Sequence, residues 1–229
     1  MMRKIFFAVI LFGVSLVGLD DFSVAQKLQK AMDEKNFQTV STIVESGDIN
    51  RIYYLKEHDL YLTPLTTAIF INDRELFKRL LQKGVDINQT DPRGLTPLFF
   101  SLRTLENYYL KELLKRGVSL EPINGTTPLL YVILDFNFVS KIKLLLHAKI
   151  DKNYKDKDGK SVLELFKEKY KLYDEMYSKI ESSTAEQIQQ MHLNSYYKQK
   201  VLEKNGKRNV LKSIDMQKIF ISRAIELLR

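Results

Sequence analysis

Apolar residues recur with a helical period through the middle of the chain. In one segment the apolar positions lie three, four or seven residues apart, at Leu65, Ala68, Ile69, Leu76, Leu80 and Leu81. This spacing is typical of amphipathic helices with one buried face, so these six residues are predicted to be core. Further along, Asp91-Pro92-Arg93-Gly94 favours a turn, Pro97 suits the first turn of a helix, and Gly117 suits a helix end. Residues 88–117 therefore predict a turn, two helices and a closing loop.

The same unit recurs with constant internal spacing. Thr-Pro-Leu occurs at residues 63–65, 96–98 and 127–129. A small or apolar residue near the start of the inner helix is followed 13 residues later by the last apolar residue of the outer helix, in the pairs Ala68 and Leu81, Ser101 and Leu114, and Val132 and Leu145. A copy without the proline keeps this interval from Ala31 to Val44, and Gly159 to Leu163 opens one more. Constant helices with variable connections are typical of a solenoid.

This unit resembles an ankyrin repeat. The resemblance covers residues 26–167, as about four units of which the first is a cap. It implies an all-α ankyrin-repeat solenoid of helix pairs joined by hairpin-like loops, with an additional C-terminal helical segment at 168–229. The histidine usual after Thr-Pro-Leu is replaced by Thr66, Phe99 and Leu130. This departure affects the expected hydrogen bonds between hairpins more than the expected fold.

Residues 1–25 predict a signal peptide. Arg3 and Lys4 precede an apolar run at residues 5–19, and Ser23-Val24-Ala25 supplies the small residues that a signal peptidase accepts. Cleavage after Ala25 would place the chain outside the cytoplasm, most simply in a periplasm. A retained N-terminal anchor is the alternative. The chain has no cysteine, which excludes a disulfide framework and a thiolate nucleophile.

The C-terminal segment is predicted to be helical. A stripe of apolar and aromatic residues favours one long helix, at Leu163, Phe166, Tyr170, Tyr173, Tyr177 and Ile180. Ser183 to Glu186 predicts the start of another helix that Asn205-Gly206 ends, and Ser213 is expected to precede a last amphipathic helix. These helices could dock on the last repeat, cover the groove of the repeats or bind a membrane.

The connection at residues 51–61 is the longest of the predicted fingers and holds three tyrosines and one histidine. Tyrosines on a projecting loop suit recognition, because each offers a rigid apolar face and a polar tip. Tyr54 and His58 are expected to be exposed and to contact a partner. The alternative for Tyr53 and Tyr61 is that they pack beneath the hairpin.

The ankyrin resemblance also implies a concave binding face along the inner helices. Its register places Phe70, Ile71, Arg103 and Leu134 on that face, and Thr90, Arg93 and Leu95 at the adjoining fingertip. The resemblance thus implies a non-enzymatic module that binds a protein partner of unknown identity. By analogy, such a module could also act as an immunity or chaperone-like inhibitor of an exported enzyme.

The net charge of +8 adds a second possibility, a membrane-surface adaptor. Lysines and arginines gather near the end of the chain, at Lys198, Lys200, Lys204, Lys207, Arg208 and Lys212. This cluster could bind anionic lipid or an acidic partner, although such runs are often only solvated surface. Nucleic acid is a less suitable partner for an exported chain.

The sequence offers little support for catalysis. His58, His147 and His192 lie far apart, and no glycine-rich phosphate loop or nucleophile elbow is present. Asp156 and Asp158 are predicted to be turn residues of a hairpin. We therefore expect no catalytic, cofactor-binding or metal-binding residue; an enzyme with an unrecognised site is the remaining alternative.

Overall fold

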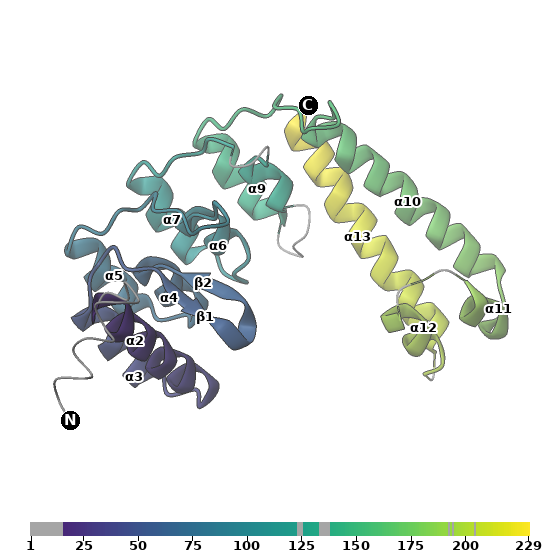
Figure 1. Ribbon diagram of the computed structural model, residues 1–229. Coiled ribbons are helices and arrows are strands. Elements are labelled where there is room, and N and C mark those ends of the chain that lie inside the picture. The colour runs from purple at the N-terminus through teal and green to yellow at the C-terminus, as the bar shows by residue number, and fades with distance from the viewer. Residues whose placement is uncertain (1–15, 123–125, 133–137, 192, 194, 204) are drawn as a thin grey trace. The chain divides into compact units, whose positions relative to one another are not determined.

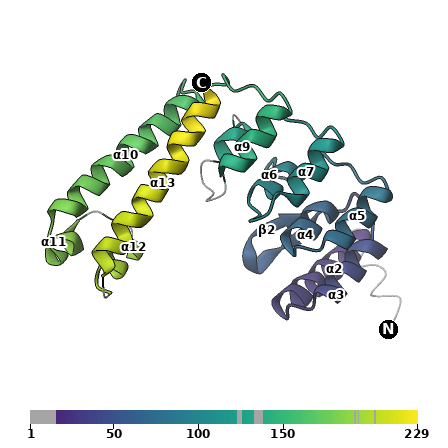
Figure 2. The same ribbon diagram turned by 180° about the vertical axis from the view of Figure 1, so that it is seen from behind.

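The computed structural model describes residues 16–122, 126–132, 138–191, 193, 195–203 and 205–229. They form two compact units, of which unit 1 ends at Ser119 and unit 2 begins at Leu120. Figures 1 and 2 show that helices dominate both units. In the described part of the chain, no helix has the length and apolar character needed to cross a membrane.

Unit 1 consists of helix pairs and one β-hairpin. Its elements are α2 (Leu16–Asp33), α3 (Phe37–Ser46), β1 (Tyr53–Leu55), a 3-10 turn (Lys56–His58), β2 (Leu60–Leu62), α4 (Pro64–Phe70), α5 (Arg74–Gln82), α6 (Pro97–Leu102) and α7 (Tyr108–Lys115). Helices α2 and α3, α4 and α5, and α6 and α7 pack as pairs, and α4 contacts both α3 and α6. Successive pairs thus stack, with the inner helices α4 and α6 side by side.

Unit 2 contains one more helix pair and a helical appendage. Its elements are α8 (Pro128–Val132), α9 (Phe138–His147), α10 (Val162–Ser182), α11 (Ala185–Gln190), α12 (Ser195–Val201) and α13 (Gly206–Leu228). Helices α10 and α13 lie side by side along their length, and α13 also packs against α9 (Figure 1). The predicted all-α fold of helix pairs joined by hairpin-like loops is confirmed.

Local sequence explains where the helices begin. Thr63 caps α4 and accepts a hydrogen bond from the amide of Thr66, while Pro64 occupies the first turn, where its missing N–H costs nothing. Asp73 caps α5 in the same way and also accepts a 2.7 Å hydrogen bond from the hydroxyl of Ser41. One side chain therefore both starts a helix and joins the first helix pair to the second.

The hairpin tips use one device twice. The Asp91 carboxylate accepts hydrogen bonds from the amides of Arg93 and Leu95, and the Asp156 carboxylate accepts from those of Asp158 and Lys160. The glycines that complete these turns, Gly94 and Gly159, have φ values of 77° and 74°. This left-handed backbone favours glycine. The prediction that Asp156 and Asp158 are turn residues is confirmed.

Unit 1 buries most of the residues predicted to be core. Leu65, Ala68, Ile69, Leu76 and Leu80 are at most 2% exposed. Leu81 is only half-buried, so its assignment to the core was wrong. Its position in α5 is about 100° around the helix from Leu80 and lies at the edge of the face that buries Leu76, Phe77 and Leu80.

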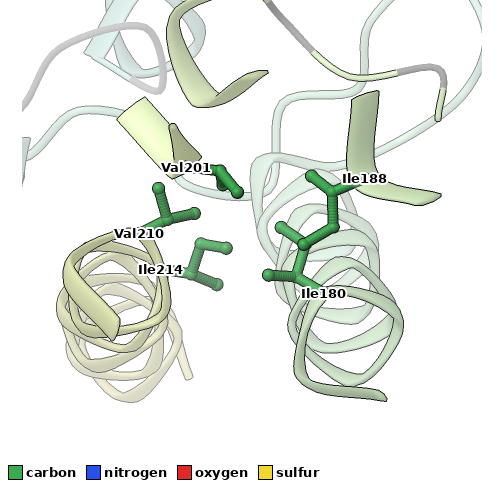
Figure 3. Packing of buried hydrophobic residues seen from close by; sticks show 5 residues of the cluster. All are labelled: Ile180, Ile188, Val201, Val210 and Ile214. Atoms are coloured by element: carbon green, nitrogen blue, oxygen red, sulfur yellow. The ribbon is translucent and has the colours of Figure 1, made fainter. Parts of the chain in front are cut away.

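The appendage of unit 2 has its own apolar cluster. Figure 3 shows side chains from α10 and α11 facing others from α12 and α13. The buried members of the cluster are Ile180, Ile188, Val201, Val210 and Ile214. Tyr173 and Tyr177 of α10 pack against it, so the predicted stripe on this helix faces α13.

Three predictions about the appendage were wrong in detail. The expected helix after Ser183 is divided into α11 and α12, and it begins at Thr184, whose hydroxyl and the Gln187 side chain form the capping box. Asn205-Gly206 opens the last helix rather than ending the previous one, so Ser213 lies inside α13. The added Cβ of an alanine at Gly206 would lie 2.0 Å from the carbonyl oxygen of Lys200, so glycine permits this close approach of α12 and α13.

Candidate interaction surface

The β-hairpin of unit 1 presents alternate side chains to opposite faces. Strands β1 and β2 are antiparallel, with Tyr54 opposite Tyr61. Tyr53 is 2% exposed and Tyr54 is 41% exposed, as the two-residue period of a strand requires. The expected exposure of Tyr54 and the packing of Tyr53 beneath the hairpin are therefore both found. Asp59 turns the chain between the strands with a positive φ of 46°.

Four side chains join the tip of this hairpin to the turn at Asp91 to Gly94 in the next repeat. The rings of Tyr54 and Tyr61 stack at 4.6 Å, and the Tyr54 hydroxyl donates to Asp59 Oδ1 at 3.2 Å. Arg93 Nη2 lies 2.7 Å from Asp59 Oδ2, and the Arg93 guanidinium lies 5.3 Å from the centre of the Tyr61 ring. Arg93 also donates to the backbone carbonyl of Asp59. We call Tyr54, Asp59, Tyr61 and Arg93 the tip cluster.

Within the tip cluster, the positive charge of Arg93 is paired with the negative charge of Asp59. Partial desolvation, followed by the hydrogen bond to the Asp59 carboxylate, raises the pKa of Tyr54. The Asp59 carboxylate in turn neutralises much of the charge on Arg93. Arg93 thus holds two hairpins together, and its charge is less available to a partner than the sequence suggested.

A hydrogen-bonded contact between His58 and Asp33 fixes the hairpin to the first helix pair. His58 Nε2 lies 2.8 Å from Asp33 Oδ1, and Gln29 Nε2 donates to both oxygens of the same carboxylate at 3.1 Å. The hydrogen bond from His58, and then that from Gln29, lowers the pKa of Asp33. The side chain of His58 is 53% exposed, as predicted. The hairpin therefore contacts the first helix pair through His58 and the following repeat through Asp59, without a bound partner.

The ends of the inner helices carry the other predicted contacts. Phe70, the last residue of α4, is 54% exposed, whereas Ile71 is half-buried. Arg103 is exposed at the end of α6 and makes no ion pair within the part of the chain that the structure describes. Leu134 lies outside the described residues. Among the described residues of this face, Phe70 is the most exposed apolar side chain that was predicted.

The predicted fingertip is only partly open. Thr90 and Arg93 are exposed, while Leu95 is half-buried and its amide donates to Asp91 Oδ1 at 2.8 Å. The structure joins Arg93 to the hairpin residues through the tip cluster. It does not bring Thr90 or Leu95 into that cluster. These two residues flank the turn that carries Arg93.

The connection between α6 and α7 holds a feature that the sequence analysis did not assign to the site. Leu105 is 81% exposed. Beside it, Arg74 of α5 pairs with Glu106, and the Arg74 guanidinium lies 4.8 Å from the centre of the Tyr108 ring. A signal was present, because Leu105 replaces the glycine that the repeat prefers between its helices. A large apolar side chain in that loop has no core to enter.

We searched the described residues for histidine and carboxylate side chains that could share a metal ion. Within the described ranges, no group of three or more such residues could hold a metal ion. Several ion pairs of unit 1 join neighbouring repeats, such as that of Arg79 Nε with Glu45 Oε1 at 2.9 Å. The exposed side chains of unit 1 include Tyr54, Phe70 and Arg103, and aromatic residues and arginine are enriched in protein interfaces.

Comparisons with known proteins agree with the repeat pattern. Residues 65–156 match the family model of ankyrin repeats in three copies. A putative ankyrin repeat protein of Borreliella burgdorferi is 26% identical over 151 residues, which are 63% of this chain and 68% of that protein. The nuclear factor NF-kappa-B p105 subunit of Gallus gallus is 30% identical over 113 residues, which are 47% of this chain and only 12% of that protein. Residues 65–156 thus carry ankyrin repeats, which in general serve as protein-interaction modules and not as enzymes.

Proposed function

We propose that this chain is a non-enzymatic module that binds a protein partner through unit 1. The partner would lie along the β-hairpin and the exposed ends of the inner helices. The observation that carries the proposal is the 54% exposure of Phe70 at the end of α4, in a helix whose other residues are all buried. Aromatic side chains are enriched at the energetic centres of protein interfaces, so an exposed phenylalanine at this position suits a contact.

The rigid hairpin supports the same proposal. Tyr54 is held by its hydrogen bond to Asp59 within the tip cluster. The contact of His58 with Asp33 holds the hairpin that carries it. A surface ordered in advance loses less conformational entropy on association. Arg103, which is exposed, would select an acidic group on the partner, while Arg93 would mainly keep the hairpins in register.

A partner captured with the tagged chain and identified by mass spectrometry would allow a direct test. We expect Phe70→Asp to weaken its affinity by at least about 30-fold in a calorimetric titration, the range of an interface hot spot. Leu172→Asp is the matched control, because Leu172 is a 64% exposed apolar residue of α10 in the other unit. Equal affinity of wild type and Phe70→Asp would overturn the proposed surface.

We also propose that residues 1–25 direct export and that the chain works in a periplasm. The support is the basic start, apolar run and small residues of the sequence. Helix α2 begins at Leu16 and continues past Ala25 to Asp33, so cleavage after Ala25 would shorten this helix. Intact mass measurement of the chain from an exporting bacterium tests the proposal. A mass that retains residues 1–25 in a cytoplasmic fraction would contradict it.

A further inference from the structure

The outer face of α13 carries exposed side chains that the packing of unit 2 does not use. One face of this helix is buried, with Val210, Ile214, Ile221, Ala224 and Leu228 at most 3% exposed. On the opposite face, five exposed residues follow one another at steps of three or four, namely Arg208, Lys212, Met216, Ile219 and Arg223. With 3.6 residues per turn they form one line about 22 Å long, which we call the α13 stripe.

The α13 stripe is cationic at both ends and apolar at its centre. Met216 and Ile219 are 49% and 46% exposed. Arg208 and Lys212 lie before them and Arg223 follows, and these three cations make no ion pair with any described residue. Exposed Glu226 lies beyond Arg223. The stripe therefore offers unneutralised positive charge beside two aliphatic side chains.

Other members of the predicted basic cluster are engaged inside unit 2. Lys207 Nζ donates to the backbone carbonyls of Glu181 and Ser183, each at 2.8 Å, and thus satisfies the end of α10. Lys200 pairs with Glu203 at 3.0 Å, and Lys204 lies outside the described residues. The cluster read from the sequence is thereby divided: Lys198 is half-buried on α12, whereas Arg208 and Lys212 are exposed on α13.

Positive charge is concentrated in the same unit. Residues 120–229 contain 20 lysines and arginines against 14 aspartates and glutamates, whereas residues 1–119 contain 16 against 14. Most of the net charge of +8 therefore belongs to unit 2. A positively charged unit is attracted to a negatively charged surface, and the attraction weakens with salt.

We propose that the α13 stripe binds the surface of an anionic lipid bilayer. Lysine and arginine side chains would lie among the phosphate groups, while Met216 and Ile219 would enter the boundary between head groups and acyl chains. Lipid surfaces accept this combination, because long cationic side chains keep their charge in the polar layer while their stems cover apolar surface. The helix would lie on the bilayer and would not cross it.

Two other occupants fit the stripe less well. An antiparallel pair of α13 helices from two copies, centred on Met216 and Ile219, would set Lys212 of each copy against Arg223 of the other, and like charges repel. An acidic protein would match the charge, but protein interfaces have cores poor in charged residues and rich in aromatic ones. The α13 stripe has three cations and no aromatic residue.

Vesicle co-sedimentation of the full chain tests the proposal. The probes are vesicles of mixed phosphatidylglycerol and phosphatidylcholine, vesicles of phosphatidylcholine alone, and soluble polyglutamate. The variant Lys212→Glu with Arg223→Glu reverses two charges of the stripe. The variant Lys111→Glu with Lys143→Glu makes the same change in net charge at exposed positions of α7 and α9. Circular dichroism melting curves establish that both variants are folded.

We expect the wild type and the Lys111 and Lys143 variant to sediment with the vesicles that contain phosphatidylglycerol, and we expect salt to reduce this binding without abolishing it. Each cation near an anionic surface contributes about fivefold, so Lys212→Glu with Arg223→Glu should weaken partitioning at least about 25-fold. The variant Met216→Ser with Ile219→Ser should reduce the binding that the wild type retains at high salt, because that binding depends on the apolar contacts. Equal sedimentation of the two charge variants, no binding by the wild type, or stronger binding to polyglutamate than to the vesicles would each overturn the proposal.

Discussion

At the scale of single residues, the stack of unit 1 depends on polar side chains that join one helix pair to the next. Tyr109 is 1% exposed, and its hydroxyl donates to Asn72 Oδ1 at 3.1 Å across two repeats. Asn72 has a φ of 57°, a left-handed conformation that asparagine tolerates, and so it closes the turn between α4 and α5. One hydrogen bond thus links a turn of the first full repeat to the core of the second.

Tyr109→Phe should destabilise the chain by about 1 kcal/mol, the net value of one intramolecular hydrogen bond. The ring and its apolar contacts remain, and the exposed amide of Asn72 can bind water instead. Urea unfolding followed by circular dichroism measures the loss. Tyr108→Phe, at the half-buried neighbouring position, is the control and should change the free energy of unfolding much less. Equal effects of the two substitutions would contradict the role of the Asn72 hydrogen bond.

The same residue gives a pH dependence. Burial raises the pKa of Tyr109 to about 12 in the folded chain. In the unfolded chain this side chain has the ordinary tyrosine pKa of about 10. The folded state therefore favours the neutral phenol, and its contribution is complete below about pH 10 and is lost as the pH rises towards 12. Over this interval the wild type should lose more stability than Tyr109→Phe, in which the group is absent. Parallel stability curves for the two proteins would show that Tyr109 does not carry this effect.

At the scale of elements, the sequence predicted those helix starts and turns that depend on residues close together in the chain. Thr63-Pro64 and the turn at Asp91 to Gly94 each specify a cap or a turn through atoms a few residues apart, whereas the cap of α5 at Asp73 was not predicted. Leu105 illustrates the limit. It replaces the residue that would adopt the left-handed turn, and the connection runs from Arg103 to Asn107, whereas the corresponding one in the previous repeat runs from Ile71 to Asp73. Its 81% exposure follows from that longer loop.

The candidate site was predictable in position more than in interactions. The position of Tyr54 on a projecting connection predicted its exposure, although the strand that turns it outward was not predicted, and the register of the repeat predicted exposure of Phe70. Pairings between distant residues carry no local signal, because Asp33 and His58, or Asp59 and Arg93, meet only when the units stack. For this reason Arg93 was predicted as a free contact although it joins two hairpins.

The junction of α12 and α13 shows how a tertiary contact overrides a local signal. Asn205-Gly206 resembles a helix stop, and Asn205 does adopt a φ of 60°, but α13 starts there because Gly206 lets the carbonyl of Lys200 approach. Gly206→Ala would place a Cβ 2.0 Å from that carbonyl oxygen and 2.6 Å from that of Val201. The junction would have to separate, at a cost of about 3 kcal/mol.

Gly159→Ala provides the comparison in the same unit. Its φ of 74° is unfavourable for alanine, yet the added Cβ meets no atom within 4 Å, so the loss should be about 1 kcal/mol. Thermal unfolding of both variants measures the difference. A smaller effect at Gly206 than at Gly159 would mean that the approach of α12 to α13 does not determine where α13 begins.

At the scale of the whole molecule, the sequence pattern and the compact units give two ways to divide the chain. The sequence places the domain boundary at residues 167 and 168, where the repeat pattern fades. Helix α10 runs through that position from Val162 to Ser182, and the compact units meet at Ser119 and Leu120. A fading sequence pattern marks the end of a repeat, whereas a cooperative unit is defined by which residues share a core. The predicted boundary remains open to experiment.

Ile214→Ala tests which division governs unfolding. Ile214 is fully buried in the cluster with Ile180 and Val210, so the truncation should cost about 2–5 kcal/mol. If residues 120–229 unfold as one unit, amide exchange measured by mass spectrometry should accelerate in α8 to α13, while residues 16–119 keep their protection. Ile219→Ala makes the same chemical change on the exposed side of α13 and should leave both patterns unaltered. Acceleration restricted to residues after 167 would support the boundary read from the sequence, and equal acceleration throughout would show that the chain unfolds as a single unit.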